Sequence, residues 1–127
     1  MITSVTPYFE DEKQLKRFLS SPWLDCIDEV IIIDDGSRKE LAKDIIREHL
    51  RKQVIPVKQK FRLLRVSENL GFNAHGCRNL GAQQATNDWL LMVDIDIDFR
   101  GLDENIKTYL DCMQEKQFVG FKFGLMF

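Results

Sequence analysis

Two clusters of aspartate residues could do chemistry, because each directly follows an apolar run. Asp34 and Asp35 come after residues 30–33, and the alternating segment 94–98 comes after residues 89–93. A short apolar run bounded by turn residues predicts a buried strand of a parallel sheet. Carboxylates just beyond two such strands converge on the edge of the sheet where open α/β folds bind ligands. Because like charges this close require a cation or a hydrogen-bonding ligand between them, the pattern predicts a binding site.

The second cluster has the chemistry of a metal site. Its aspartates are Asp94, Asp96 and Asp98, separated by Ile95 and Ile97. Residues two apart in an extended segment point to the same face, so the carboxylates would project together while the isoleucines face the other way. Mg²⁺ and Mn²⁺ favour such ligands, together with phosphate oxygens of a substrate, and would stabilise a departing diphosphate. A lone Asp-x-Asp is more often an acidic surface turn; the preceding strand and the other cluster favour the metal site.

The first cluster needs a different role, since one metal ion does not need five carboxylates. A carboxylate at the end of a strand can accept hydrogen bonds from a base N–H or from ribose hydroxyls. Residues 35–37 also fit a tight turn followed by a helix N-cap. The turn accounts for Gly36 and Ser37 but leaves the doubled aspartate unexplained.

The elements that must position these clusters alternate along the chain. Apolar runs predict strands at residues 2–6, 28–33, 61–66, 89–93 and 118–123. Helices are expected at residues 11–20, from Ser37 to about residue 50, and at 73–85 and 103–115. Ser37 and Glu40 have the spacing of a capping box that opens the second helix. This order predicts an α/β fold: one domain over residues 1–127 with a mainly parallel sheet and helices on both faces.

Two of these helices indicate how they pack. Leu15, Phe18 and Leu19 recur at the i, i+3, i+4 spacing of a helix face that points to a core. The helix at residues 73–85 carries small residues on one face, among them Cys77 and Gly81. Small residues allow a helix to approach a sheet or a ligand closely.

Composition excludes several classes of function. The 127 residues carry a net charge of -2, which argues against nucleic-acid binding. The basic stretch formed by Lys58, Lys60, Arg62 and Arg65 is interpreted as a solvated face. Three cysteines without Cys-x-x-Cys spacing argue against a disulfide framework or a zinc site and favour a reducing cytosol. Because charged residues 10–13 interrupt the N-terminal segment, we expect no signal peptide, and no apolar run reaches the roughly 20 residues that a membrane span needs. We therefore expect a cytoplasmic protein, with attachment to a membrane surface through a partner left open.

Four short segments carry a recognisable series of motifs. They are residues 31–37 (Ile-Ile-Ile-Asp-Asp-Gly-Ser), 69–73 (Asn-Leu-Gly-Phe-Asn), 77–81 (Cys-Arg-Asn-Leu-Gly) and 91–96 (Leu-Met-Val-Asp-Ile-Asp). Their order and spacing resemble those of family 2 glycosyltransferases with the Rossmann-like GT-A fold, and residues 4–8 resemble that family's first strand and turn. The resemblance implies the nucleotide-sugar-binding half of an inverting, metal-assisted glycosyltransferase. Such an enzyme would take its sugar from a UDP- or GDP-linked donor and move it to a glycan, lipid or protein acceptor.

The resemblance also implies roles for individual residues around the donor. Thr6 and Pro7 would line the base pocket, and Asp34 or Asp35 would bind the base or the ribose. Arg78 would face the nucleotide or its phosphates. A guanidinium near phosphates is a good bidentate partner in its own right, although a surface arginine in a salt bridge is an equally simple interpretation.

By the same likeness, Asp94 would bind the donor and, with Asp96, hold Mg²⁺ or Mn²⁺; Asp98 is a further candidate ligand. The chain departs from the family in that Ile97 separates Asp96 from the next aspartate, whereas family members usually have one directly after the pair. The half that carries acceptor contacts and the general base is not recognisable. No residue in 118–127 can be nominated as the base, so the catalytic residue is unknown.

Two alternatives remain at this stage. The same residues would serve a non-catalytic or truncated nucleotide-sugar-binding module that needs a partner chain or a second copy. A phosphoacceptor receiver domain also combines a small doubly wound sheet with aspartates at strand ends. Receiver domains carry their Asp pair on the first strand, whereas Asp34 and Asp35 follow the second predicted strand, which argues against that alternative.

Overall fold

The computed structural model describes residues 1–97 apart from 56–58, 69 and 72. The described strands are β1 (Ile2–Tyr8), β2 (Glu29–Asp34), β3 (Lys60–Arg65) and β4 (Trp89–Met92). The described helices are α1 (Glu12–Leu19), the 3-10 helix η1 (Pro22–Cys26), α2 (Ala42–Lys52) and α3 (Ala74–Gln84). The predicted helix at 103–115, the predicted strand at 118–123 and Asp98 lie outside the described residues.

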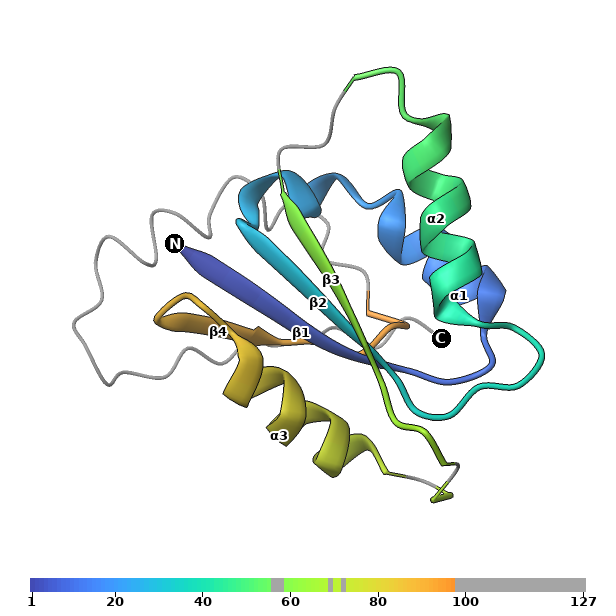
Figure 1. Ribbon diagram of the computed structural model, residues 1–127. Coiled ribbons are helices and arrows are strands. Elements are labelled where there is room, and N and C mark those ends of the chain that lie inside the picture. The colour runs from blue at the N-terminus through green and yellow to red at the C-terminus, as the bar shows by residue number, and fades with distance from the viewer. Residues whose placement is uncertain (56–58, 69, 72, 98–127) are drawn as a thin grey trace, which may run out of the picture.

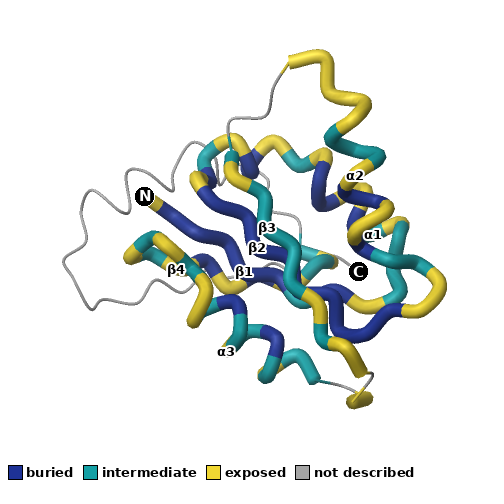
Figure 2. Tube along the Cα trace, in the orientation of Figure 1, coloured by how far each residue is buried: buried dark blue, intermediate teal, exposed yellow. Residues whose placement is uncertain are grey.

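The described strands form one parallel sheet in the order β3-β2-β1-β4. Helices α1 and α2 cover one face of the sheet and α3 covers the other (Figure 1). The predicted α/β class, with a mainly parallel sheet and helices on both faces, is therefore confirmed. The central strands β1 and β2 are the most buried part of the sheet, while β3 and β4 form its edges (Figure 2).

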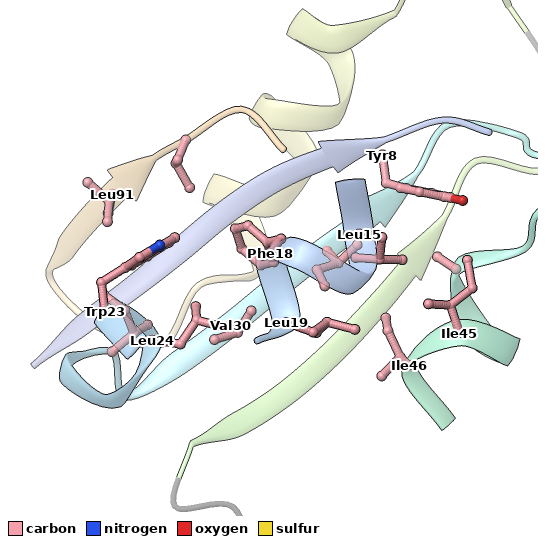
Figure 3. Close-up of a cluster of buried hydrophobic side chains, with 14 of the residues drawn as sticks. Tyr8, Leu15, Phe18, Leu19, Trp23, Leu24, Val30, Ile45, Ile46 and Leu91 are labelled. Atoms are coloured by element: carbon pink, nitrogen blue, oxygen red, sulfur yellow. The ribbon is translucent and has the colours of Figure 1, made fainter. Parts of the chain in front are cut away.

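The larger core lies on the face covered by α1, η1 and α2 (Figure 3). Helix α1 starts after Asp11, whose side chain accepts a hydrogen bond from the Gln14 N–H and so caps the first turn. Its inward face is the predicted one, with Leu15, Phe18 and Leu19 all buried. The rings of Phe18 and Trp23 meet edge to face, with centroids 5.4 Å apart and an interplanar angle of 81°.

Helix α3 approaches the opposite face very closely because its inward residues are small. Cys77 packs in a cluster with Val5, Ile31 and Ile33. A Cβ atom added at Gly81 would overlap the side chain of Val5 and lie 2.9 Å from Cδ1 of Ile33. The predicted small-residue face of this helix is thus the face that contacts the sheet.

Because of this contact, Gly81→Ala is predicted to lower the stability of the fold, the opposite of the usual effect of this substitution in a helix. In a helix without neighbours, replacing Gly with Ala gains roughly 0.5–1 kcal/mol of stability. At Gly81 the added methyl group forces α3 away from Val5, and overpacking of this kind costs about 1–3 kcal/mol. We expect chemical denaturation to show a lower free energy of unfolding for Gly81→Ala.

Gly76→Ala is the matched control on the same helix. The three atoms nearest to a Cβ there all belong to the side chain of Asn73, which caps no backbone group and can turn away. Its stability should stay unchanged or rise slightly. Equal losses in both variants would show that helix backbone effects, and not the contact with the sheet, decide the outcome.

A buried carboxylate at the start of β2 joins the end of α3 to the sheet. The side chain of Glu29, at the start of β2, is 2% exposed. It accepts hydrogen bonds from the Thr3 hydroxyl (2.9 Å) and the Thr86 N–H (3.0 Å), and Arg62 lies 3.4 Å away. Arg62 also donates to the carbonyl of Gln84, the last residue of α3. Burial opposes ionisation of Glu29, but these partners hold its pKa below the usual value.

Candidate functional site

A pocket of about 550 Å³ opens where the order of the strands reverses. From β1 the chain proceeds to β2 and β3 on one side, whereas β4 adds to the other side of β1. Such a switch point, at the carboxyl ends of the strands, is where open α/β sheets bind ligands. The lining residues come from the end of β1 and the residue after it, from the segments after β2 and β4, and from the first turns of α3 with the turn before it. They are Pro7, Tyr8, Phe9, Asp35, Gly71, Ala74, Arg78, Asp94, Ile95 and Asp96.

Asp35 places one unsatisfied carboxylate oxygen at this pocket. The residue follows β2, and its N–H donates to the carbonyl of Tyr8 across 2.8 Å. Its Oδ2 accepts from the N–H of Asn73, just before α3, at 3.2 Å. Its Oδ1 is buried without a hydrogen-bond partner among the described residues. Because buried polar atoms are nearly always paired, Oδ1 is an acceptor that still lacks a hydrogen-bond partner.

Asp34 lies beside Asp35 but has a different environment. Its Oδ1 accepts from the Ser37 N–H (2.8 Å) and its Oδ2 from the Ala42 N–H (3.0 Å). Arg65 lies 3.3 Å from Oδ2 and also donates to the Ser37 carbonyl. Both oxygens of Asp34 therefore hold the connection between β2 and α2, and the residue is not part of the pocket lining.

The predicted capping box of Ser37 and Glu40 is wrong. Helix α2 begins only at Ala42, and its N-cap residue Leu41 makes no side-chain cap. Ser37 instead lies in the turn held by Asp34, where its hydroxyl accepts from the N–H of Glu10. The Glu40 carboxylate likewise accepts from the N–H of Glu12. Because the side chains of Ser37 and Glu40 both bond to residues outside α2, their spacing does not start a helix.

Glu10 fixes the same connection from the other side. It has a positive φ of 44° and aims its carboxylate at a run of backbone N–H groups. Its Oε1 accepts from Arg38 (2.8 Å), Lys39 (3.0 Å) and Glu40 (3.1 Å). The Tyr8 hydroxyl donates to the Glu40 carbonyl at 2.6 Å. The segment behind Asp35 is therefore held by several hydrogen bonds before any ligand arrives.

The Asp-x-Asp pair lies on the β4 side of the pocket. Asp94 and Asp96 are exposed and line the pocket, while Ile95 and Ile97 pack against the larger core. The backbone forms a turn here, closed by a hydrogen bond from the Ile97 N–H to the Asp94 carbonyl, instead of the predicted extended segment. The turn still separates the carboxylates from the isoleucines as expected.

Arg78 reaches the same pocket from α3. Its guanidinium donates to Oδ1 of Asp94 at 2.6 Å, and the two side chains are 29% and 55% exposed. Asp94 and Asp96 are therefore the described carboxylates that could hold a metal ion. No group of three or more His, Cys, Asp or Glu residues in the described part of the chain could hold one. Two carboxylates that leave the remaining positions to water and phosphate match the ligand set of Mg²⁺.

Of the two residues predicted to line the base pocket, Pro7 lines the observed pocket and Thr6 does not. Pro7 lines the pocket, together with Tyr8 and Phe9, which sequence reasoning did not select. Thr6 is fully buried and does not line it. Gly71 also lines the pocket, at a φ of 79° that favours glycine. Its turn was recognisable from the sequence Asn-Leu-Gly, whereas nothing in the sequence indicated Phe9.

The thiol beneath Asp35 is not reactive. Cys77 is fully buried on α3, and burial together with the charge of Asp35 raises its pKa to about 11. A thiol with this pKa stays protonated at neutral pH and cannot act as a nucleophile. The chemistry of the pocket therefore depends on its carboxylates and on Arg78.

Comparisons with known proteins agree with this geometry. The family model described as glycosyl transferase family 2 matches residues 3–100. Among solved structures, the crystal structure of S. aureus TarS 1–349 is similar, with a TM-score of 0.63 and 21% sequence identity. The match covers 87% of this chain and 32% of the TarS chain, and it shows a shared fold. No curated protein sequence matches the chain.

Proposed function

Because this chain belongs to glycosyl transferase family 2, we propose that its pocket binds a nucleotide-diphosphate sugar and that the sugar is transferred to an acceptor. The observation that carries the proposal is the pocket itself. It lies at the switch point of the sheet and combines the unsatisfied Oδ1 of Asp35 with Arg78 and the Asp-x-Asp pair. These groups can bind a base or ribose, a phosphate and a metal ion.

Asp35, and not Asp34, is the proposed partner of the base or the ribose. Its free Oδ1 can accept from a base N–H or a ribose hydroxyl, whereas the oxygens of Asp34 are engaged within the protein. Pro7 and Phe9 supply apolar surface on which a base can pack. Thr6 remains a predicted donor-binding residue that no finding tests.

The charge of the pocket supports a metal ion at the diphosphate. Asp35, Asp94, Asp96 and Arg78 are its charged lining residues, three negative and one positive, so the lining carries two net negative charges. A diphosphate would be repelled by this lining unless a divalent cation lay between them. We propose that Asp94 and Asp96 hold Mg²⁺ or Mn²⁺, with Asp98 as a candidate third ligand. When bound, the metal would neutralise the charge that develops on the departing diphosphate.

A donor-binding module without transfer activity is the second candidate. The chain spans 32% of the TarS chain that it matches, so the transfer activity of a whole enzyme is a proposal for this chain. No general base can be nominated among the described pocket residues. In this case a partner chain or a second copy would supply the acceptor side.

Location and acceptor stay predictions. None of the helices in the described part of the chain combines the length and the apolar character needed to cross a membrane. The cytoplasmic location rests on the cysteine pattern, and the identity of the glycan, lipid or protein acceptor is open.

The test is calorimetric titration of UDP and of GDP, each with and without Mn²⁺, against the purified chain. We expect binding of at least one nucleotide that depends on the metal. A folded chain that binds neither nucleotide under either condition would contradict the proposal. If binding is found, release of sugar or its transfer to added acceptors separates the enzyme from the module.

Asp35→Asn sharpens this test at one residue. The amide keeps an acceptor for the Asn73 N–H but removes the charge that strengthens a hydrogen bond from the nucleotide. We expect affinity for the nucleotide to fall roughly tenfold, the scale of one hydrogen bond to a charged group. Thermal unfolding of the variant is the control for folding. Unchanged affinity would remove Asp35 from the proposed contacts.

A further inference from the structure

Within the pocket, Arg78 and Asp94 neutralise each other. The 2.6 Å contact between the guanidinium and Oδ1 is the shortest ion pair among the described residues, and both side chains line the pocket. Both have a further proposed use: Asp94 for a metal ion and Arg78 for the phosphates. This inference rests on the proposed function and concerns how those two uses are connected.

The two uses conflict while the ion pair is intact. One oxygen of Asp94 is engaged by Arg78, and a divalent cation at Asp94 would lie next to a positive guanidinium. A diphosphate removes the conflict, because phosphate oxygens are bidentate partners for arginine as good as a carboxylate. Arg78 can therefore exchange Asp94 for the phosphate, which leaves Asp94 with its charge unpaired.

We propose that this exchange couples the two ligands: Arg78 weakens metal binding to the empty pocket and strengthens it once a diphosphate is present. Without a nucleotide, Arg78 shields Asp94. With a nucleotide, Arg78 turns to the phosphate and Asp94 becomes free for the cation. By linkage, the metal must then raise the affinity for the diphosphate by the same factor.

The surroundings of Arg78 allow such an exchange. The backbone of α3 is held against the sheet at Cys77, directly before Arg78, and at Gly81, about one turn after it, so the helix need not move. The Arg78 side chain is 29% exposed and Asp94 is the described partner of its guanidinium. A change of side-chain rotamer therefore suffices for Arg78 to leave Asp94 for a phosphate in the same pocket.

The experiment measures Mn²⁺ binding to the purified chain by calorimetry and by the electron paramagnetic resonance of free Mn²⁺, with and without UDP and GDP. Arg78→Met removes the charge and keeps the length of the side chain. Arg78→Lys keeps a cation next to Asp94. Arg47→Met, an exposed residue of α2 on the opposite face of the sheet, controls for the loss of one positive charge.

We expect Arg78→Met to bind Mn²⁺ about fivefold more tightly than the wild-type chain when no nucleotide is present, the scale of one partly exposed ion pair. With a nucleotide present, the same variant should bind Mn²⁺ more weakly than the wild type. Arg78→Lys and Arg47→Met should both match the wild type without nucleotide.

Weaker or unchanged Mn²⁺ binding by Arg78→Met without nucleotide would overturn the coupling. The proposed function would survive that result if the wild type still binds nucleotide and metal together. A wild-type chain that binds neither ligand in any combination would overturn both. Circular dichroism of each variant shows whether the fold is intact.

Discussion

Asp96→Asn is expected to abolish metal-dependent nucleotide binding while leaving the fold intact. Asp96 is exposed, lines the pocket and makes no hydrogen bond with another described residue that would compete for its carboxylate. An amide is a poor ligand for Mg²⁺ or Mn²⁺. The affinity of the variant for the nucleotide in the presence of metal should therefore fall by roughly a hundredfold or more. Calorimetric titration with Mn²⁺ and UDP or GDP measures the change.

Asp88→Asn is the matched control for Asp96→Asn. Asp88 is an exposed aspartate directly before β4, at the opposite end of that strand from the pocket. Its variant should bind like the wild type, and both variants should unfold within about 0.5 kcal/mol of it, as exposed substitutions do. Wild-type affinity in Asp96→Asn would exclude Asp96 as a metal ligand.

Glu29→Ala is expected to be the most destabilising single change considered for this sheet. It removes the acceptor of Thr3 and Thr86, whereas Arg62 keeps its hydrogen bonds to Gln84. Each buried donor left without an acceptor costs about 1–3 kcal/mol, so two such losses are a large part of the 5–15 kcal/mol by which domains are typically stable. Urea denaturation at pH 7 measures the loss.

Glu29→Gln separates the charge of this residue from its hydrogen bonds. The amide keeps an acceptor for Thr86, so its loss should be smaller, about 1–2 kcal/mol. Because the folded pKa of Glu29 lies below the ordinary 4.5, its charge contributes fully above pH 4.5 and is lost as the pH falls through the folded pKa. The difference in stability between wild type and Glu29→Gln should therefore close below that pH.

Glu68→Ala is the control for Glu29→Ala. Glu68 lies at an exposed position after β3, so its removal should cost little stability. Equal losses of stability in Glu68→Ala and Glu29→Ala would contradict the argument.

The described fold could be predicted from local patterns because its strands are apolar runs and its helices have distinct faces. Residues 30–33 are fully buried as predicted, and the i, i+3, i+4 face of α1 is the buried one. The observed ends of some elements differ from the predicted ones, because tertiary contacts determine where these elements begin and end. Strand β1 extends through Pro7 to Tyr8, although proline predicts an end. No local signal shows that Ser37 bonds to Glu10 and not to a helix.

The location of the candidate site could be predicted from the sequence, but the roles of its individual residues could not. Two aspartates in sequence after a strand look alike, and only tertiary structure shows that Asp34 holds a turn while Asp35 faces the pocket. The basic stretch after α2 was interpreted as a solvated face. Arg62 and Arg65 instead pair with Glu29 and Asp34, buried carboxylates on the neighbouring strand. Such partners are set by strand register, which the sequence pattern does not specify.

The order of the strands has a consequence for how this sheet is completed during synthesis. Of the described strands, β1 leaves the ribosome first, yet one of its edges pairs with β4, where Ile2 meets Trp89. At about 5–20 residues per second, roughly 4–17 s pass between the synthesis of these two residues. Until then the central strand has an open edge, a template for pairing with other chains. Of the described strands, the first to be translated is thus among the last to be fully paired, and chaperones that bind nascent chains have several seconds in which to shield it.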